Sequence, residues 1–258
     1  MTDLETLVVD RDGPVLTVTL SRPERKNALD PQMAAELLEL FRGVPQDGEV
    51  RVVVITGAGD AFCSGADLGA TADTAHALVR MRDIHRVAQA LHDVPQPTIA
   101  RINGVAAGAG LNIALGCDLT VASTEARFSE IFARRGLSTD FGGAWLLPRL
   151  VGLHRAKELA LLAEILPASE AERLGLVNRV VPPDELDAVV DEWARRLAAG
   201  PPIALAQTKQ MLNQSVESSW ETMLAAEGTA QAVNFSTADT VEAMSAFFEK
   251  REPTFEGR

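Results

Sequence analysis

The sequence predicts an α/β fold that gives way to a helical region near its C-terminus. Two apolar, β-branched runs at residues 52–56 and 98–102 are continuous, which is typical of strands covered on both faces of a sheet. Helical patterns separate these runs, and such alternation indicates helical crossovers between parallel strands. After Asp184 only helix signals remain. We therefore expect an α/β core at residues 1–200 and a helical region at residues 201–258.

The core elements can be assigned in chain order. Residues 15–20 alternate between apolar side chains and threonine, as a half-buried strand does. Asp30 and Pro31 then supply an N-cap and a first helical position, and an apolar stripe follows at helical spacing. A long helix is expected at residues 73–92, and residues 119–122 form another short apolar run. These elements give the alternating order of an α/β core.

The C-terminal quarter carries four helical patterns. Residues 186–197 form one apolar stripe, and Gly200-Pro201-Pro202 then breaks the chain. Further helices are expected at residues 203–216, 219–234 and 237–250. No internal repeat is apparent in the sequence.

Composition and charge exclude several functional classes. The 258-residue chain carries a formal net charge of −12, so its overall field disfavours nucleic acid and anionic membranes. Residues 104–115 form the most apolar stretch, and they are too few to span a bilayer. No signal peptide is recognisable at the N-terminus, and we expect a cytoplasmic protein. Cys63 and Cys117 are expected as buried, reduced thiols, and the four histidines lack metal-ligand spacing, so no metal site is predicted.

Two segments rich in small residues are the strongest candidates for a functional site. Ala61–Leu68 follows a predicted strand, and Ile102–Asn112 leads from a strand into an apolar helix. The first N–H groups of a helix have no intrahelical acceptor and carry the positive end of the helix dipole. One such N–H can stabilise a developing oxyanion by roughly 3 kcal/mol. Either segment alone is also typical of a tight strand–helix turn, and neither matches a P-loop or a GxGxxG motif, but the pair is more specific.

Five segments, in order along the whole chain, resemble the crotonase superfamily of enoyl-CoA hydratases and isomerases. They include an RP-x-x-x-NAL segment, an F-x-x-G-A-D-L segment, an NG-x-A-x-G segment ending in Cys-Asp, and a GG-x-x-LPRLVG segment. In this chain they are Ser21–Leu29, Ala61–Leu68, Ile102–Asp118, Gly136–Gly152 and Phe247–Arg258.

The resemblance implies a spiral of ββα turns and a homotrimer or a dimer of trimers. It also implies an acyl-CoA thioester as the substrate, with no cofactor beyond the coenzyme A that the substrate carries. The thioester oxygen would lie in an oxyanion hole made by the N–H groups of Ala66 and Ala109. Ala109 replaces the commoner glycine, and the backbone donor is kept.

The resemblance further assigns a surface to coenzyme A. Its residues here are Arg22, Lys26, Ala28, Ala66, Asp67, Leu68 and Lys250. Arg25 and Arg251 lie beside them, and each charge alone is also typical of a solvated surface. As a cluster against a net charge of −12, they are candidate phosphate contacts. Phe247 and Phe255 either cover the adenine or pack.

The positions that carry two glutamates in the family's hydratases have other residues here. One position is Asn112 and the other is Phe132, while Glu130 lies two residues out of register and is interpreted as a surface or loop carboxylate. An amide can hold a water or a substrate oxygen but cannot act as a base, and a phenyl ring can do neither. Both hydratase carboxylates are therefore predicted to be missing.

Asp140 is the acid that remains in the family's active-site segment. The matching position carries the working carboxylate in several branches of the superfamily, and one carboxylate suffices to move a proton between two carbons. Phe132 and Phe141 would raise its pKa through burial. Asp140 could also be a helix N-cap, or serve as both.

Three functions stay open from the sequence. The first is an enoyl-CoA isomerase in fatty-acid or aromatic-acid catabolism, with Asp140 as the acid and base and Asn112 beside it. The second is an enoyl-CoA hydratase that uses Glu130, or uses Asp140 with a water held by Asn112. The third is a silent acyl-CoA binder. The helix at 73–92 and the loop at 69–71 are expected to wall the acyl pocket.

Overall fold

A six-stranded sheet forms the centre of the molecule in the computed structural model, which describes residues 4–69 and 76–258. Its order is β1-β2-β3-β5-β7-β10; β1 is antiparallel to β2 and the other neighbours are parallel. The strands are β1 (Leu7–Asp12), β2 (Val15–Leu20), β3 (Val52–Gly57), β5 (Thr98–Ile102), β7 (Leu119–Ser123) and β10 (Arg179–Val181). This α/β architecture confirms the predicted fold class.

A second sheet lies beside the first and carries the site. Its order is β4-β6-β8-β9, with β9 antiparallel to β8. The strands are β4 (Ala61–Cys63), β6 (Val105–Ala107), β8 (Arg127–Ser129) and β9 (Leu166–Pro167). None of these was predicted, because strands of two or three residues are too short to show a period of two.

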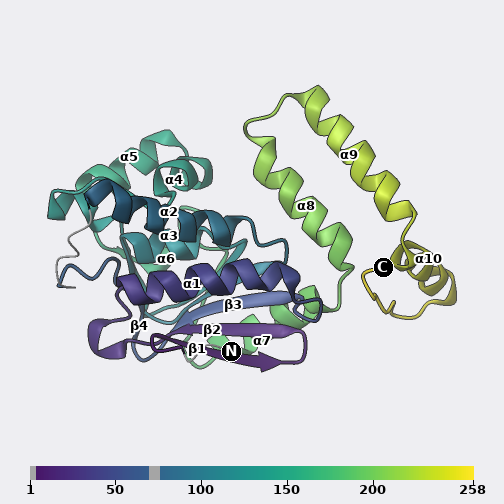
Figure 1. Ribbon diagram of the computed structural model, residues 1–258, viewed down its shortest axis with the longest axis horizontal. Helices are drawn as coiled ribbons and strands as arrows, with labels where there is room; N and C mark the ends of the chain where they lie inside the picture. Colours follow the sequence, from purple (N-terminus) through teal and green to yellow (C-terminus); the bar gives the residue numbers. More distant parts are fainter. Residues whose placement is uncertain (1–3, 70–75) are drawn as a thin grey trace.

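Helices cover both faces of the larger sheet (Figure 1). The helices of the core are α1 (Pro31–Gly43), α2 (Ala77–His92), α3 (Ala109–Leu115), α4 (Gly143–Val151), α5 (Leu153–Leu162), α6 (Ala168–Arg173) and α7 (Leu186–Ala198). The Asp30 carboxylate caps α1 by accepting a hydrogen bond of 2.8 Å from the Met33 N–H, as the sequence predicts. The expected start of α2 at 73–75, and most of the loop at 69–71, lie outside the described residues.

The two faces of the larger sheet bury different sets of side chains. Every residue of β3 is buried, which explains why its sequence does not alternate. Val52 and Val54 pack with Val189 and Val190 of α7, whereas Val53 and its neighbours on that side join the main core beneath α1 and α3.

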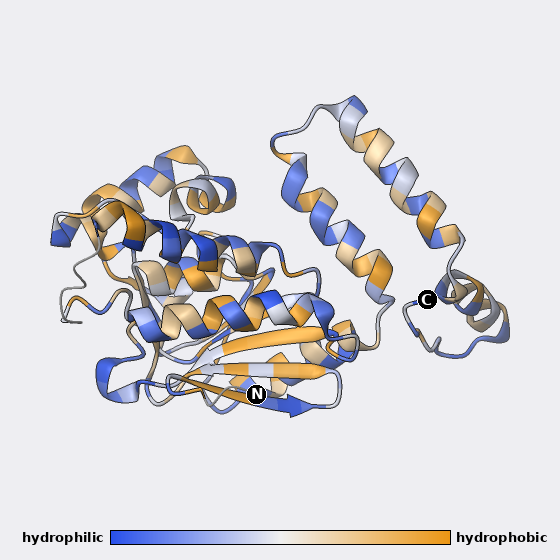
Figure 2. Ribbon diagram, viewed as in Figure 1, coloured by the Kyte–Doolittle hydropathy of each residue, from blue (hydrophilic) through white to orange (hydrophobic). Residues whose placement is uncertain are grey.

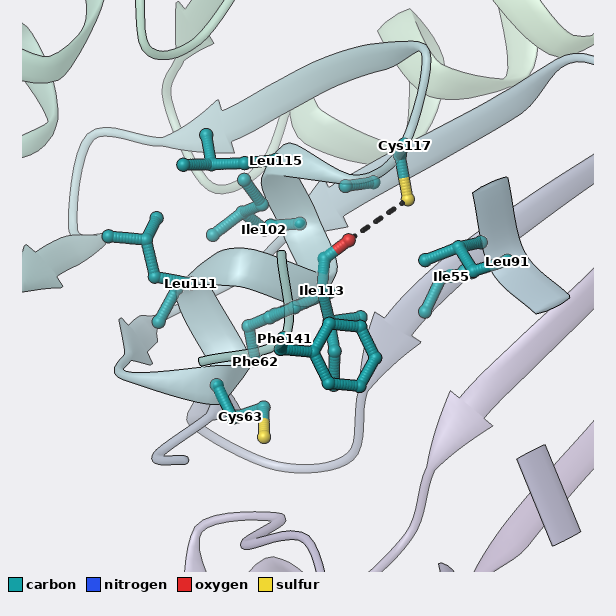
Figure 3. Close-up of a cluster of buried hydrophobic side chains, with 14 of the residues drawn as sticks. Ile55, Phe62, Cys63, Leu91, Ile102, Leu111, Ile113, Leu115, Cys117 and Phe141 are labelled. Carbon is teal, nitrogen blue, oxygen red and sulfur yellow. Dashed lines mark hydrogen bonds between the residues drawn. The ribbon is translucent and has the colours of Figure 1, made fainter. Parts of the chain in front are cut away.

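Helix α3 is buried along its whole length, as Figure 3 shows. It packs among aromatic side chains that include Phe62 and Phe141. The Cys117 thiol donates to the Ile113 carbonyl, and burial raises the pKa of this thiol to about 12. Cys63 is also buried and free, which confirms that both cysteines are internal thiols.

Three helices after residue 200 form a separate arm: α8 (Pro202–Ser215), α9 (Trp220–Phe235) and α10 (Ala238–Glu249). Figure 1 shows α8 and α9 side by side and α10 at the end of the molecule farthest from β4. Figure 2 shows hydrophobic residues along the helices of this arm. Several large ones are exposed, among them Leu212, Trp220, Phe235, Phe247 and Phe248. A single chain therefore leaves an extended apolar surface without a partner.

No helix in the described part of the chain combines the length and apolar character that crossing a bilayer requires.

Candidate active site

The two predicted small-residue segments meet in space. Gly65 has a φ of +99°, and a Cβ added there would lie 2.8 Å from the Ala107 carbonyl oxygen and 3.6 Å from the Ala109 nitrogen. Glycine is therefore required at this position both by its backbone conformation and by the close approach of the second segment. This contact places the Ala66 and Ala109 backbones next to each other.

The N–H groups of Ala66 and Ala109 are not used to hold the segments in place. Ala66 pairs with Leu29 through the Leu29 N–H, which donates to Gly65, and through the Asp67 N–H, which donates to Leu29. The Ala66 N–H therefore points away from Leu29. Ala109 is the first residue of α3, so its N–H has no hydrogen-bond acceptor within the helix.

The RP-x-x-x-NAL segment anchors the first of these turns. Asn27 is fully buried, and its Nδ2 donates 2.8 Å hydrogen bonds to the carbonyls of Ala58 and Ala61. Its Oδ1 accepts from the Arg22 N–H at 2.9 Å. Asn27 therefore links three stretches of backbone at the foot of the turn, a role that its sequence position alone does not reveal.

Arg22 is predicted to contact phosphate, but its side chain forms ion pairs and a hydrogen bond with other groups of this chain. Its guanidinium pairs with Asp67 at 2.9 Å and Asp30 at 3.2 Å, and donates to the Ala28 carbonyl. The Arg22 side chain holds the pKa of Asp67 below its usual range. The structure thus brings Arg22, Ala28 and Asp67 together as a brace for the turn that carries Ala66.

The remaining predicted coenzyme A contacts are split between two ends of the chain. Lys26 and Leu68 are exposed near the brace, and the Lys26 carbonyl accepts from the Ser64 N–H. Lys250 is exposed at the end of α10, far from β4 (Figure 1). One chain therefore does not bring Lys250 to the other predicted contacts.

A cavity of about 760 Å³ opens between the core and the C-terminal arm. Side chains from α2, α3, α4 and α8 line it, including His85, Gln89, Asn112, Phe141, Trp145 and Asn213. This wall combines aromatic and hydrogen-bonding groups, and α2 contributes to it. Ala66, Ala109, Glu130 and Asp140 are not among its lining residues, and Asn112 is the residue that the cavity shares with the site.

The C-terminal arm is held against the core by polar contacts that the sequence did not reveal. Glu217 accepts from the Trp145 indole at 2.7 Å and pairs with Arg149 at 3.0 Å. Lys209 of α8 pairs with Asp118 at 2.7 Å. Asp118, the acid of the Cys-Asp pair in the third motif, therefore has a structural role.

Asn112 occupies the centre of the site and is fully buried. Its Nδ2 donates to the Asp140 carbonyl at 2.9 Å. A Cβ on Gly143 would overlap this amide, so the start of α4 can lie here only because residue 143 is glycine. Asn112 thus fixes the backbone that carries Asp140.

Asp140 is not a helix N-cap, and that alternative was wrong. Helix α4 begins at Gly143 with Gly142 in the capping position, and no side chain accepts a capping hydrogen bond. Only the Asp140 carbonyl contacts the helix, by accepting from the Gly143 N–H. The carboxyl group is thereby left for another role.

The Asp140 carboxyl is suited to proton transfer near neutral pH. Its Oδ1 is buried and has no hydrogen-bond partner among the residues the structure describes. Burial raises the pKa of Asp140 to about 6, and the charge of His85 acts in the opposite direction. An acid with this pKa can both accept and return a proton in that pH range.

Glu130 lies in the connection between β8 and the 3-10 turn at residues 131–135, but it is not a surface carboxylate, and that part of the interpretation was wrong. It is 1% exposed, and its Oε2 accepts from the Thr139 hydroxyl at 2.9 Å. Burial raises its pKa to about 7; the hydrogen bond from Thr139 and the nearby Asn112 amide lower it, and the charge of Asp140 raises it. Glu130 therefore belongs to the same buried cluster as Asn112 and Asp140.

The sequence did contain a signal for this inward orientation. Phe128, Glu130 and Phe132 occur at a spacing of two, and all three are buried. Phe132 lies beside the glycine-rich turn, because a Cβ on Gly108 would be 3.6 Å from its ring. The Phe132 ring therefore occupies the position at which the family resemblance expects a glutamate in hydratases.

Known proteins resemble this chain over nearly its whole length. The family model described as enoyl-CoA hydratase/isomerase matches residues 10–258. An Escherichia coli K12 relative named 1,2-epoxyphenylacetyl-CoA isomerase is 38% identical over 252 residues, covering 95% of each chain. A Rhodobacter capsulatus relative named probable enoyl-CoA hydratase is 41% identical over 243 residues, covering 93% of this chain and 94% of its own.

Solved structures agree with the sequence relatives. The structure of a putative enoyl-CoA hydratase from Streptomyces coelicolor A3(2) superposes with a TM-score of 0.95 at 39% identity, covering 100% of this chain and 96% of that one. Enoyl-CoA hydratase from Bacillus anthracis gives a TM-score of 0.94 at 33% identity, with 98% and 100% covered. Together with the ordered motifs and the two adjoining turns, these matches show that the chain belongs to the enoyl-CoA hydratase/isomerase family, the crotonase superfamily.

Proposed function

We propose that this enzyme moves the double bond of an enoyl-CoA thioester, with Asp140 as its acid and base. The observation that carries the proposal is the Asp140 carboxyl, half-buried, with an unpartnered Oδ1 and a pKa raised to about 6. Phe132 occupies the second hydratase position and cannot activate water. A relative named trans-2-decenoyl-[acyl-carrier-protein] isomerase, 32% identical over 262 residues, supports isomerisation of an enoyl thioester.

The proposed reaction needs one proton carrier and one oxyanion site. The N–H groups of Ala66 and Ala109 hold the thioester oxygen. The Asp140 carboxylate removes a proton from carbon 2 of a 3-enoyl-CoA, and the electron pair of that C–H bond spreads into a dienolate whose charge rests on the held oxygen. Asp140 then returns the proton to carbon 4, leaving a 2-enoyl-CoA. No water is consumed.

The mass of the product tests this proposal. We expect a 3-enoyl-CoA to give a product of unchanged mass with the absorbance of a conjugated thioester. The same assay with crotonyl-CoA should show no gain of one water. A ring-containing acyl-CoA belongs in the screen, because the cavity wall carries both Trp145 and the polar side chains of His85 and Gln89.

Hydration is a second candidate, and the burial of Glu130 beside Asp140 favours it. Two carboxyl groups could hold and deprotonate a water. In that case crotonyl-CoA would gain the mass of water, and Glu130→Gln would abolish the gain. Thioester binding without any turnover would instead indicate a silent binder.

The apolar surface of the C-terminal arm supports a further proposal, a homotrimer or a dimer of trimers. Assembly would cover side chains such as Trp220 and Phe248, which are 73% and 79% exposed in one chain. It could also bring Lys250 of one subunit to the coenzyme A surface of another. Sedimentation velocity at micromolar concentration should show a trimer or hexamer, and a single monomeric species would contradict this assembly.

A further inference from the structure

Three buried side-chain oxygens of the site lack a hydrogen-bond donor among the residues that the structure describes. They are Asn112 Oδ1, Glu130 Oε1 and Asp140 Oδ1. Turning the Asn112 amide would not help, because its oxygen would then face the Asp140 carbonyl that its Nδ2 now contacts at 2.9 Å. A buried acceptor without a donor is costly, so three in one cluster indicate a missing hydrogen.

A single proton on Glu130 would relieve this deficit. A protonated Oε1 becomes a donor and can bond to the Asn112 side chain, which lies within hydrogen-bonding range of Glu130, so Glu130 Oε1 and Asn112 Oδ1 gain a partner at once. The other oxygen, Oε2, already accepts from Thr139. Two carboxylates in one poorly solvated site also repel each other, which disfavours ionisation of both.

The surroundings favour Glu130 over Asp140 as the protonated member. Glu130 is 1% exposed, whereas Asp140 is only half-buried and its charge is better solvated. His85 of α2 acts on Asp140 and favours its charged form. Helix α3 presents only the uncharged Asn112 to Glu130.

The other charged groups nearby do not change this assignment. Arg134 and Arg135 on the 3-10 turn after Glu130 are exposed. On helix α5, which packs against that turn, Arg155 pairs with Glu158. No positive charge therefore neutralises Glu130 within the described residues of this cluster.

We propose that Glu130 is a positioning residue that is held protonated and donates a hydrogen bond within the Asn112–Asp140 cluster, which leaves Asp140 as its one ionised carboxylate. The protonated state of Glu130 stands independently of the reaction. Its consequence for catalysis rests on the proposed function, in which Asp140 must begin the cycle ionised. Glu130 itself does not contact the substrate.

Glu130→Gln tests the protonated state without any substrate. The amide has the shape of the protonated acid and keeps a donor. At about pH 6.5, above the pKa of Asp140 and below that of Glu130, infrared spectra of the unmodified protein should contain a protonated-carboxyl band that Asp140→Asn retains and Glu130→Gln loses in large part. A difference spectrum without that band would overturn the proposal.

The pH dependence of stability gives a second substrate-free readout. The folded-state pKa of Glu130, about 7, is raised above the ordinary value of 4.5. Its contribution to stability is therefore present below pH 4.5 and is lost as the pH rises through about 7. We expect the Tm of Glu130→Gln minus that of the unmodified protein to be larger at pH 8 than at pH 5; an equal difference at both would contradict the proposal.

Activity then tests the positioning role. Because Asp140 and Glu130 both titrate, kcat of the unmodified enzyme should follow a bell-shaped curve against pH. It should rise as Asp140 ionises and fall as Glu130 ionises. Glu130→Gln should lose the falling limb, whereas Glu130→Ala, which removes the donor, should lose roughly tenfold in kcat below the pH at which Glu130 ionises. Loss of all activity in Glu130→Gln would make Glu130 a catalytic base instead. If no enoyl-CoA is turned over, the proposed function fails, while the infrared and Tm results still decide the protonation of Glu130.

Discussion

Asp140→Asn should lower kcat by about 10² to 10⁴-fold, the usual contribution of a general acid or base. The amide keeps the size of the side chain, and the backbone contacts from Asn112 and Gly143 go to the Asp140 carbonyl, which the substitution leaves in place. The fold and thioester binding should therefore persist. Steady-state kinetics with a 3-enoyl-CoA, together with a binding isotherm for the saturated thioester, measure the two effects separately.

Asn112→Ala is the matched control for this substitution. Asn112 holds the backbone of Asp140 through one 2.9 Å hydrogen bond and has no proton to exchange at neutral pH. We expect a smaller loss of kcat, roughly tenfold, because a typical hydrogen bond contributes about 1 kcal/mol. A loss at Asn112 as large as that at Asp140 would mean that the amide acts directly on the substrate.

Ala109→Pro should lower turnover severely. Proline lacks the N–H that the proposed oxyanion hole needs, and loss of one such donor costs about 10² to 10³-fold in kcat. Residue 109 is the first of α3, a position where proline is well tolerated, and the preceding residue is Gly108. The folded state should therefore survive.

Ala109→Gly is the control for that variant, because it keeps the N–H and removes only a methyl group. It should retain most of the activity. Circular dichroism and the Tm of both variants show whether they fold. A folded Ala109→Pro enzyme with normal turnover would eliminate this oxyanion site.

The sequence predicted the parts of the fold whose stabilisation is local or periodic. The strands at 15–20 and 52–56 follow from their hydrophobic patterns, and the start of α1 follows from Asp30 and Pro31. The three helices after residue 200 were located to within about two residues because each has its own apolar pattern.

The parts that could not be predicted depend on contacts between distant segments. The short strands of the second sheet show no periodicity, and only the folded chain shows that Glu217 reaches Trp145 across 72 residues. Motif comparison located Asp140 and Asn112. It missed Glu130, because counting positions against a family pattern says nothing about which side chains turn inward.

The central claim is that one carboxylate, Asp140, moves a proton between two carbons without adding water. The most direct test uses a 3-enoyl-CoA carrying deuterium at carbon 2, incubated with the unmodified enzyme in ordinary water and followed by mass spectrometry. The account predicts a 2-enoyl-CoA in which part of the deuterium has moved to carbon 4. It also predicts that Asp140→Asn abolishes this transfer. A product heavier by one water, formed at the same rate by the Asp140→Asn enzyme, would contradict the account.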